Sequence, residues 1–274
     1  MPVCSLDHHV PGPPRLVAGV LRETTTATTA VARLGARLRA PAALLVAGDE
    51  VTITLPGRVL TVRTRITDAG VDGLVSERAA GPVAVLRHVT RIAPDGHGTR
   101  VHDEITWEPP LGMLGRLSDP VLRPFARRLL VVRRDALAGR VAELAAAPAV
   151  VGAAVVRDGR LLVAQRSYPP ELAGRWELPG GGVEAGESEA GALRRELFEE
   201  LGAHVRAGAR VGTDLPIGRR VLRIHRAELE PGSPEPEARE HRELRWVGPA
   251  EVATLGWLDA DRAVLAELVD LLRP

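Results

Sequence analysis

The chain of 274 residues contains no lysine, so its 36 basic side chains other than histidine are all arginines. Without lysine, Schiff-base catalysis and catalysis by a lysine general base are excluded. Cysteine is almost absent too: Cys4 is the single example, which excludes an internal disulfide and a metal cluster built on cysteine. A reducing, cytoplasmic setting is therefore the expectation.

Long apolar runs are also missing. No uninterrupted apolar stretch approaches the ~18 residues of a transmembrane helix, so we expect no membrane partner. The N-terminal residues Met1–His9 lack a basic segment followed by an apolar one, so no secretory signal is expected. Hydrophobic residues still make up 45% of the chain, which is enough for two domains with cores of ordinary size.

The chain also lacks a dense cluster of basic residues. Residues 1–149 carry 19 arginines against 14 acidic residues, and residues 150–274 carry 17 against 21. No stretch is basic enough to form the footprint of a nucleic-acid polymer, so we expect no such partner. The acidic surplus of the second half indicates a local cluster of carboxylates there.

The first half has the pattern of an antiparallel sheet followed by one long helix, an α+β arrangement. Residues 1–14 are rich in proline, glycine and histidine and are predicted to be a disordered lead-in. Residues 15–147 are predicted to form the first domain, with a mainly strand-like pattern from Arg15 to about Thr106. From Leu114 to Ala147 apolar residues recur three and four apart, which predicts a long amphipathic helix.

A run of alanines ending at Pro148 is predicted to link this half to a second domain, residues 150–274. There a glycine-rich loop, whose backbone can approach a ligand closely, precedes a helix. Ser188 is a plausible N-cap for that helix, and Gly202 is expected to end it after Leu201. The loop glycines are Gly180, Gly181, Gly182 and Gly186.

Three glutamates, Glu196, Glu199 and Glu200, share one face of this helix because they are three and four residues apart. Carboxylates crowded in this way repel one another, and a divalent cation would relieve the repulsion better than a neighbouring arginine. Oxygen ligands of this kind suit Mg²⁺ or Mn²⁺. On charge alone, however, a solvated acidic helix face explains the glutamates equally well.

The order of residues favours the metal site. The segment from Gly181 to Ala203 resembles the Nudix box, Gly-x5-Glu-x7-Arg-Glu-U-x-Glu-Glu-x-Gly-U, in which U is a bulky aliphatic residue. Ala203 at the last position is smaller than usual, which concerns packing at the helix end and no ligand. The positions that match are Gly181, Glu187, Arg195, Glu196, Leu197, Glu199, Glu200 and Gly202.

The resemblance implies an α/β/α sandwich around a mixed sheet, with an activity that hydrolyses a nucleoside diphosphate linked to another group. It implies Glu200 as the principal metal ligand, with the carbonyl of Gly180 opposite and with Glu196 and Glu199 completing the acidic cluster. Arg195 is expected to orient Glu187. The alternative for that pair is an ordinary surface ion pair worth less than ~1 kcal/mol.

Flanking residues resemble the MutT-type branch, which cleaves oxidised nucleotides such as 8-oxo-dGTP or cytidine nucleotides. Residues 151–166 are predicted to form a hairpin that ends at Arg166, which is expected to contact the nucleotide. The segment Glu177-Leu178-Pro179-Gly180 is expected to line the floor of the pocket. For Trp176 we prefer simple core packing.

Two further acidic residues have counterparts in this branch. Glu240, six residues before Trp246, matches an additional metal ligand or the base that orients water. Asp261 matches a base-reading side chain, although either Asp259 or Asp261 could instead cap a helix. An aspartate there leaves cytidine-type bases open beside 8-oxoguanine.

The resemblance thus implies that a nucleoside triphosphate is cleaved to a monophosphate and pyrophosphate, with Mg²⁺ (or Mn²⁺) as cofactor. Glu196 or Glu240 would accept the proton of the attacking water, and the two remain open. Two other functions also stay open: a Nudix activity on ADP-ribose or a dinucleoside polyphosphate, and a sensor that binds nucleotide without turnover.

The first domain, by its order of strands and then one helix, resembles the START-like (SRPBCC, helix-grip) superfamily. Members hold an apolar ligand between a curved sheet and a helix, so a hydrophobic small molecule is a candidate partner. His88 and His102 are predicted to lie on strands as core or surface residues, and no catalytic residue is expected here.

Overall fold

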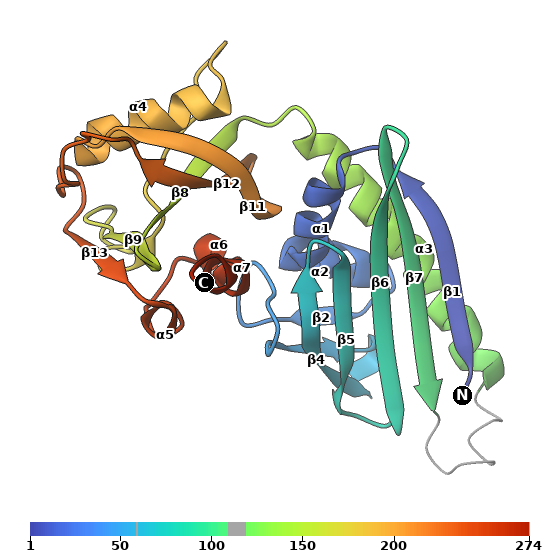
Figure 1. Ribbon diagram of the computed structural model, residues 1–274. Helices are drawn as coiled ribbons and strands as arrows, with labels where there is room; N and C mark the ends of the chain where they lie inside the picture. Colours follow the sequence, from blue (N-terminus) through green and yellow to red (C-terminus); the bar gives the residue numbers. More distant parts are fainter. Residues whose placement is uncertain (59, 109–118, 274) are drawn as a thin grey trace. The chain divides into compact units, whose positions relative to one another are not determined.

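The computed structural model describes residues 1–58, 60–108 and 119–273 (Figure 1). Contacts between Cα atoms divide the chain into two compact units, Met1–Ala146 and Ala147–Pro274. Each unit has one sheet and its own helices. Across the described ranges, none of the helices combines the length and the apolar character needed to cross a membrane.

The first unit is built on a seven-stranded sheet with the order β1-β7-β6-β5-β4-β3-β2, antiparallel throughout. Strands β2 to β7 pair with their neighbours in sequence, which is typical of successive hairpins. The strands are β1 (Val3–Val10), β2 (Arg37–Arg39), β3 (Glu50–Thr54), β4 (Thr61–Gly70), β5 (Gly73–Ala80), β6 (Val85–Asp95) and β7 (Gly98–Glu108).

Three helices accompany this sheet: α1 (Pro14–Arg22), α2 (Thr24–Ala32) and α3 (Asp119–Leu144). The long helix α3 contacts β1, α1 and α2 and runs along the sheet beside β1 and β7 (Figure 1). Its residues Ala126 and Leu130 pack with Ile105 and Trp107 of β7 in one buried cluster. The amphipathic pattern in the sequence therefore reflects a helix whose apolar side meets the sheet.

Two predictions for this unit were wrong. Residues 1–14 are not a disordered lead-in, because Val3–Val10 form strand β1, which pairs along β7 from Val3 with Thr106 to Val10 with Thr99. The pairing partner lies about a hundred residues away, so no local pattern announces it. Pro14–Arg22 and Thr24–Ala32 are helices and not strands, since packing against α3 overrides the strand preference of the threonines in α2.

The long helix ends at Leu144, three residues before the predicted end at Ala147. It begins at Asp119, and the predicted start at Leu114 lies outside the described residues. Pro120 lies in its first turn, where a missing N–H donor costs least, whereas Pro124 lies inside the helix.

The second unit has a mixed six-stranded sheet, as expected. The path is β10-β9-β8-β12-β11, with β13 paired to β9. Strands β12 and β8 are parallel, and every other pair is antiparallel. The strands are β8 (Ala149–Arg157), β9 (Arg160–Gln165), β10 (Trp176–Glu177), β11 (Val205–Ile217), β12 (Arg220–Leu229) and β13 (Glu243–Val247).

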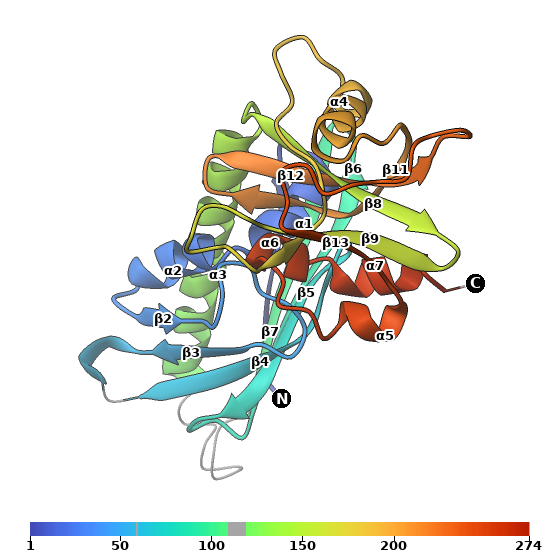
Figure 2. The same ribbon diagram turned by 90° about the vertical axis from the view of Figure 1, so that its left-hand side faces the viewer.

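Helix α4 (Glu189–Leu201) lies on one face of this sheet, and the short helices α6 (Asp259–Arg262) and α7 (Leu265–Leu271) lie on the other, as both views show (Figures 1 and 2). A further turn of helix, α5 (Pro249–Val252), precedes them. The apolar stripe Leu193, Leu197 and Leu201 of α4 is fully buried against β8 residues such as Val151. This packing fixes which face of α4 is left for its glutamates.

Both ends of α4 agree with the sequence. Ser188 is the N-cap, and its hydroxyl accepts the N–H of Gly191 at 3.0 Å. Gly202 ends the helix with a φ of 68°, a left-handed conformation that glycine adopts without strain. The hairpin β8–β9 also has the predicted turn at Asp158 and Gly159.

Candidate active site

The loop that leads to α4 runs beside β8 and turns one glycine toward the helix. Ala153 N–H donates to the carbonyl of Pro179 (2.8 Å), and Val151 N–H donates to that of Gly181 (2.9 Å). On the opposite side, the N–H of Gly180 donates to Oε2 of Glu200 at 3.0 Å. Gly180 has a φ of 147°, and a Cβ there would overlap the carbonyl oxygen of Val151, so only glycine fits.

Arg195 is the centre of the acidic face of α4. Its guanidinium contacts both oxygens of Glu187 (2.9 and 3.1 Å) and the carbonyl of Gly182 (2.9 Å). It also reaches Glu196 at 3.0 Å and Glu199 at 3.3 Å. The expected contact of Arg195 with Glu187 is therefore present. Hydrogen bonds from Arg195 lower the pKa of Glu187 below its usual value.

Glu200 lies deeper than the other glutamates. Burial raises its pKa to about 7, and the charges of Glu196 and Glu177 act in the same direction. The charge of His241 and the N–H of Gly180 oppose this shift. A carboxylate that is costly to ionise in the protein alone gains most from a nearby cation, because the cation favours the charged form.

The donor set fits a divalent cation that keeps part of its ligands from water and phosphate. Glu196 lies so close to Gly181 that a Cβ on that glycine would overlap the carboxylate, and Glu200 lies at Gly180. Among the described residues the carbonyl of Gly180 accepts no hydrogen bond, which leaves it available as a ligand. Two carboxylates and one carbonyl match what Mg²⁺ commonly takes from a protein.

The same side chains do not form a closed metal cage by themselves. Within the described ranges, no group of three or more histidine, cysteine, aspartate or glutamate side chains converges on one point. Glu196 and Glu199 are instead held by Arg195.

The side of the loop toward β9 carries the residues expected to bind the nucleotide. Nη1 of Arg166 donates to Oε2 of Glu177 at 2.5 Å, and Nε donates to the carbonyl of Tyr168 at 3.0 Å. The carboxylate of Asp261 accepts the N–H of Leu178 at 3.1 Å. The structure thus joins Asp261 to the segment 177–180, although they are far apart in sequence.

Asp261 does not cap a helix, because the N-cap of α6 is Leu258. Its side chain is 5% exposed, and burial, helped by the charge of Glu177, raises its pKa to about 7 against the N–H of Leu178. Leu178 itself and Trp176 are each 5% exposed, so Trp176 is a core residue, as preferred. Of the segment 177–180, only Glu177 presents a functional side chain.

The side chain of Glu240 makes no hydrogen bond or ion pair with the glutamates of α4 among the described contacts. That side chain is exposed, and the backbone carbonyl of Glu240 accepts a hydrogen bond from the Ser167 hydroxyl at 2.6 Å. The next residue, His241, points inward instead: Nε2 lies 3.4 Å from Oε1 of Glu177, and Nδ1 is buried with no partner among the described residues.

Sequence reasoning therefore missed His241, although it stands beside Glu240 in the same segment. Burial lowers the pKa of His241, but its contact with Glu177 and the charge of Glu200 outweigh burial and raise the pKa above its usual value. His241 links Glu177 on the nucleotide side with Glu200 on the metal side. Its place between two partly buried carboxylates is visible only in the folded chain.

A second charged network, also missed, holds the first turn of α4 on the sheet. Glu189 accepts hydrogen bonds from Arg210 of β11 (2.7 Å) and Arg223 of β12 (2.6 Å), and Nε2 of His225 lies 3.0 Å away. Arg210 and Arg223 also reach Asp214, at 3.0 and 3.5 Å. The sequence separations are too large for a motif to reveal them.

Replacing Glu189 by glutamine is expected to lower the free energy of unfolding of the second unit by about 1–3 kcal/mol, because partly buried arginines lose their counter-charge. Thermal unfolding measures the change. Glu228→Gln is the control: Glu228 also pairs with two arginines, Arg206 and Arg226, but on an exposed surface. Equal shifts for both variants would contradict the structural role of Glu189.

Comparison with known proteins identifies relatives of the second unit, which holds this site. The family model described as "NUDIX domain" matches residues 146–269. A "Putative 8-oxo-dGTP diphosphatase 2" of Mycobacterium tuberculosis is 54% identical over 123 residues, which are 43% of this chain and 86% of that protein. The "CTP pyrophosphohydrolase" of Escherichia coli is 36% identical over 123 residues, covering 44% and 91%.

Among solved structures, the E. coli ORF135 protein has 35% sequence identity and a TM-score of 0.40, with 45% of this chain and 89% of that chain covered. The family model spans the glycine loop, the acidic face of α4 and Asp261. Through this second unit, and through relatives most of whose length it covers, the chain belongs to the Nudix hydrolase family, whose members cleave phosphorus-containing anhydrides.

Proposed function

We propose that the second unit is a nucleoside triphosphate pyrophosphohydrolase of MutT type, which cleaves its substrate to a nucleoside monophosphate and pyrophosphate. The proposal rests on one observation: the same loop contacts two sets of acidic side chains. Glu196 and Glu200 lie at its glycines, and Glu177 and Asp261 lie at its other end. A nucleoside triphosphate needs two neighbouring sites of this kind, one for its phosphate chain and one for its base. Such an enzyme would meet its substrate in the cytoplasm.

Mg²⁺ or Mn²⁺ is the proposed cofactor, held by Glu196, Glu199, Glu200 and the carbonyl of Gly180. When bound, such an ion neutralises charge on the phosphate oxygens and lowers the pKa of water. Glu199 is the most exposed of the three glutamates, with 53% of its side chain accessible. It is therefore placed to meet the ion at the open side of the site.

In the proposed reaction, water attacks a phosphorus atom, a P–O anhydride bond breaks, and pyrophosphate leaves with the electron pair. A carboxylate takes the proton of the water. Glu196 is the better candidate, because its carboxylate lies at the glycine loop whereas the side chain of Glu240 is exposed. Arg195, bonded to Glu187 and Glu196, is proposed to hold that base in position.

The base of the nucleotide is proposed to bind at Arg166, Glu177 and Asp261. With a pKa of about 7, Asp261 is partly protonated near neutral pH and can donate as well as accept. Such a group can pair with a purine such as 8-oxoguanine or with a cytosine. The names of the relatives point to the same two classes, 8-oxo-dGTP and CTP.

A nucleotide panel tests the proposal. The full chain with Mg²⁺ or Mn²⁺ is incubated with 8-oxo-dGTP, dGTP, CTP, 5-methyl-dCTP and ADP-ribose, and products are separated by anion exchange. We expect pyrophosphate and a monophosphate from 8-oxo-dGTP or from a cytidine triphosphate, and no turnover with EDTA.

Other outcomes distinguish the alternatives. Monophosphates released from ADP-ribose alone would replace the proposal by another Nudix activity. Tight binding of a triphosphate without any product would indicate a sensor. Inorganic phosphate in place of pyrophosphate would show that a different anhydride bond is cleaved.

For the first unit we propose a binding function for a hydrophobic small molecule, in the manner of the START-like, helix-grip proteins that it resembles. A cavity of about 200 Å³ between α3 and the sheet supports this. Its lining is mainly apolar and includes Leu122, Phe125 and Leu129 of α3 with Ile105 and Trp107 of β7. A space of this kind is typical of ligand sites.

A further inference from the structure

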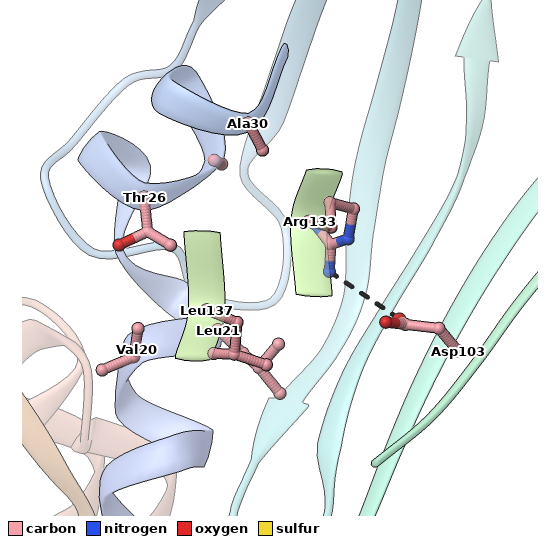
Figure 3. Close-up of a pocket in the computed structure, with 8 residues that line it drawn as sticks. Val20, Leu21, Thr26, Ala30, Asp103, Arg133 and Leu137 are labelled. Atoms are coloured by element: carbon pink, nitrogen blue, oxygen red, sulfur yellow. Dashed lines mark ion pairs between the residues drawn. The ribbon is translucent and has the colours of Figure 1, made fainter. Parts of the chain in front are cut away.

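Three polar residues, Thr64, Ser76 and His88, interrupt the otherwise apolar lining of the first unit's cavity, and His88 has a defined hydrogen-bond partner. His88 of β6 lines the cavity, and its Nε2 lies 3.0 Å from Oδ1 of Asp103 on β7. Asp103 is 1% exposed and also accepts the hydroxyl of Thr90 at 2.5 Å. Arg133 of α3 faces the same carboxylate at 3.9 Å (Figure 3).

These contacts determine the protonation of the pair. Burial would raise the pKa of Asp103, but His88, Arg133 and Thr90 outweigh burial and hold it well below its usual range, so the carboxylate is ionised. Burial, together with the charge of Arg133, lowers the pKa of His88 against the influence of Asp103, so the imidazole is neutral.

The tautomer of His88 follows. Nε2 carries the hydrogen and donates it to Asp103, which leaves a lone pair on Nδ1. No group among the described residues is hydrogen-bonded to this Nδ1. Ser76 of β5 lines the same cavity and is the cross-strand partner of His88. Because Cβ atoms of such partners are ~4.5–5.5 Å apart, the side chain of Ser76 starts beside that of His88, within reach of a polar group that contacts both.

The acceptor Nδ1 of His88 and the nearby Ser76 side chain together determine which polar group a ligand can place there. A ligand hydroxyl can donate to Nδ1 and accept from Ser76. A carboxylate offers no hydrogen to Nδ1 and would bring a second negative charge near Asp103. A ligand with no polar group would leave the lone pair of His88 buried and unpaired, which costs free energy.

The size of the ligand follows from the space. An engineered apolar cavity of ~150 Å³ holds benzene, so about 200 Å³ suits a molecule somewhat larger, such as a bicyclic aromatic. A second hollow, among α1, α2, α3 and Asp103 (Figure 3), measures only about 10 Å³. It has room for about one water molecule and is too small for a ligand.

We propose that the first unit binds a neutral, mainly apolar molecule of about bicyclic size that carries one hydroxyl, and that this hydroxyl donates to Nδ1 of His88 beside Ser76. The inference rests on the ligand-binding function proposed for this unit, and it names the chemistry of the ligand. The anchor Asp103–His88 lies across strands β7 and β6, whose rigid pairing holds the acceptor in place.

Three probes of one shape test the proposal: 2-naphthol, naphthalene and 2-naphthoate, titrated into the full chain and followed by calorimetry or probe fluorescence. We expect 2-naphthol to bind about 2- to 10-fold tighter than naphthalene, the range for one neutral hydrogen bond. 2-Naphthoate should bind most weakly. In His88→Phe the preference for 2-naphthol over naphthalene should disappear while naphthalene still binds.

Ser76→Ala provides a second variant with a smaller change, in which the preference should fall without loss of folding as judged by circular dichroism. The matched control is His102→Phe, since His102 is a β7 histidine paired with Asp7 and does not line the cavity. It should bind all three probes as the wild type does.

The outcomes separate the two levels of the proposal. Equal binding of naphthalene and 2-naphthol by the wild type, or a preference that survives in both His88→Phe and Ser76→Ala, would overturn the hydroxyl assignment and leave the binding function standing. Failure of all three probes to bind the wild type would overturn the binding function as well.

Discussion

Glu200→Gln is expected to reduce kcat for nucleotide hydrolysis by at least about 100-fold, because loss of even an indirect partner of a bound metal costs ~10- to 100-fold. The glutamine can still accept the N–H of Gly180, so the loop should keep its shape. The assay is pyrophosphate release with Mg²⁺. Glu235→Gln is the control, since Glu235 pairs with Arg157 on the surface, away from the loop.

In the absence of metal, Glu200→Gln should be at least as stable as the wild type. The folded-state pKa of Glu200, about 7, lies above its ordinary value, so the folded chain binds more protons than the unfolded chain between those two pH values. The stability contributed by this group is therefore present at low pH and lost as the pH rises through about 7.

At pH 8 in EDTA a neutral glutamine avoids that loss, and the melting temperature should equal or exceed that of the wild type. Reduced activity together with a lower melting temperature in EDTA would indicate a structural role for Glu200. Full activity of Glu200→Gln would remove it from the metal site.

Gly180→Ala is expected to destabilise the second unit by about 3 kcal/mol or more and to abolish hydrolysis. Two causes act together: a φ of 147° is strained for any residue with a Cβ, and that Cβ would overlap the carbonyl oxygen of Val151. The loop would have to leave β8, and with it the N–H that holds Glu200. Thermal unfolding and the pyrophosphate assay measure the two effects.

Gly182→Ala is the matched control, two residues along the same loop. A Cβ on Gly182 would meet nothing within 4 Å, and its φ is not positive. Its effect on the free energy of unfolding should stay within ~0.5 kcal/mol, as for most surface substitutions. Equal destabilisation by the two alanines would mean that the loop is sensitive to any side chain and that the contact of Gly180 with β8 is not special.

The site was predictable where function depends on neighbours along one helix. Glu196, Glu199 and Glu200 share a face because of helical periodicity alone, and Arg195 reaches Glu187, which lies only eight residues earlier, just before the helix begins. Ser188 and Gly202 mark the helix ends for equally local reasons. These features need no knowledge of the rest of the chain.

The site was not predictable where distant segments meet. Glu240 and His241 are neighbours, yet β13 and the loop before it leave the first exposed and the second buried beside Glu177. The family resemblance placed Asp261 in the site, but only the structure shows that its carboxylate accepts the N–H of Leu178, from a segment about eighty residues earlier. Side-chain direction in a loop depends on what packs against it.

The sequence by itself determined the Nudix helix with its glycine loop, the mixed-sheet fold of the second half, and the change from strands to one long helix in the first. Tertiary structure alone decided that Val3–Val10 is an edge strand, that Pro14–Arg22 and Thr24–Ala32 are helices, and that His88 and Arg133 meet the buried Asp103. The physical reason is range: periodicity and capping act over a few residues, whereas strand pairing and burial depend on partners that only folding brings together.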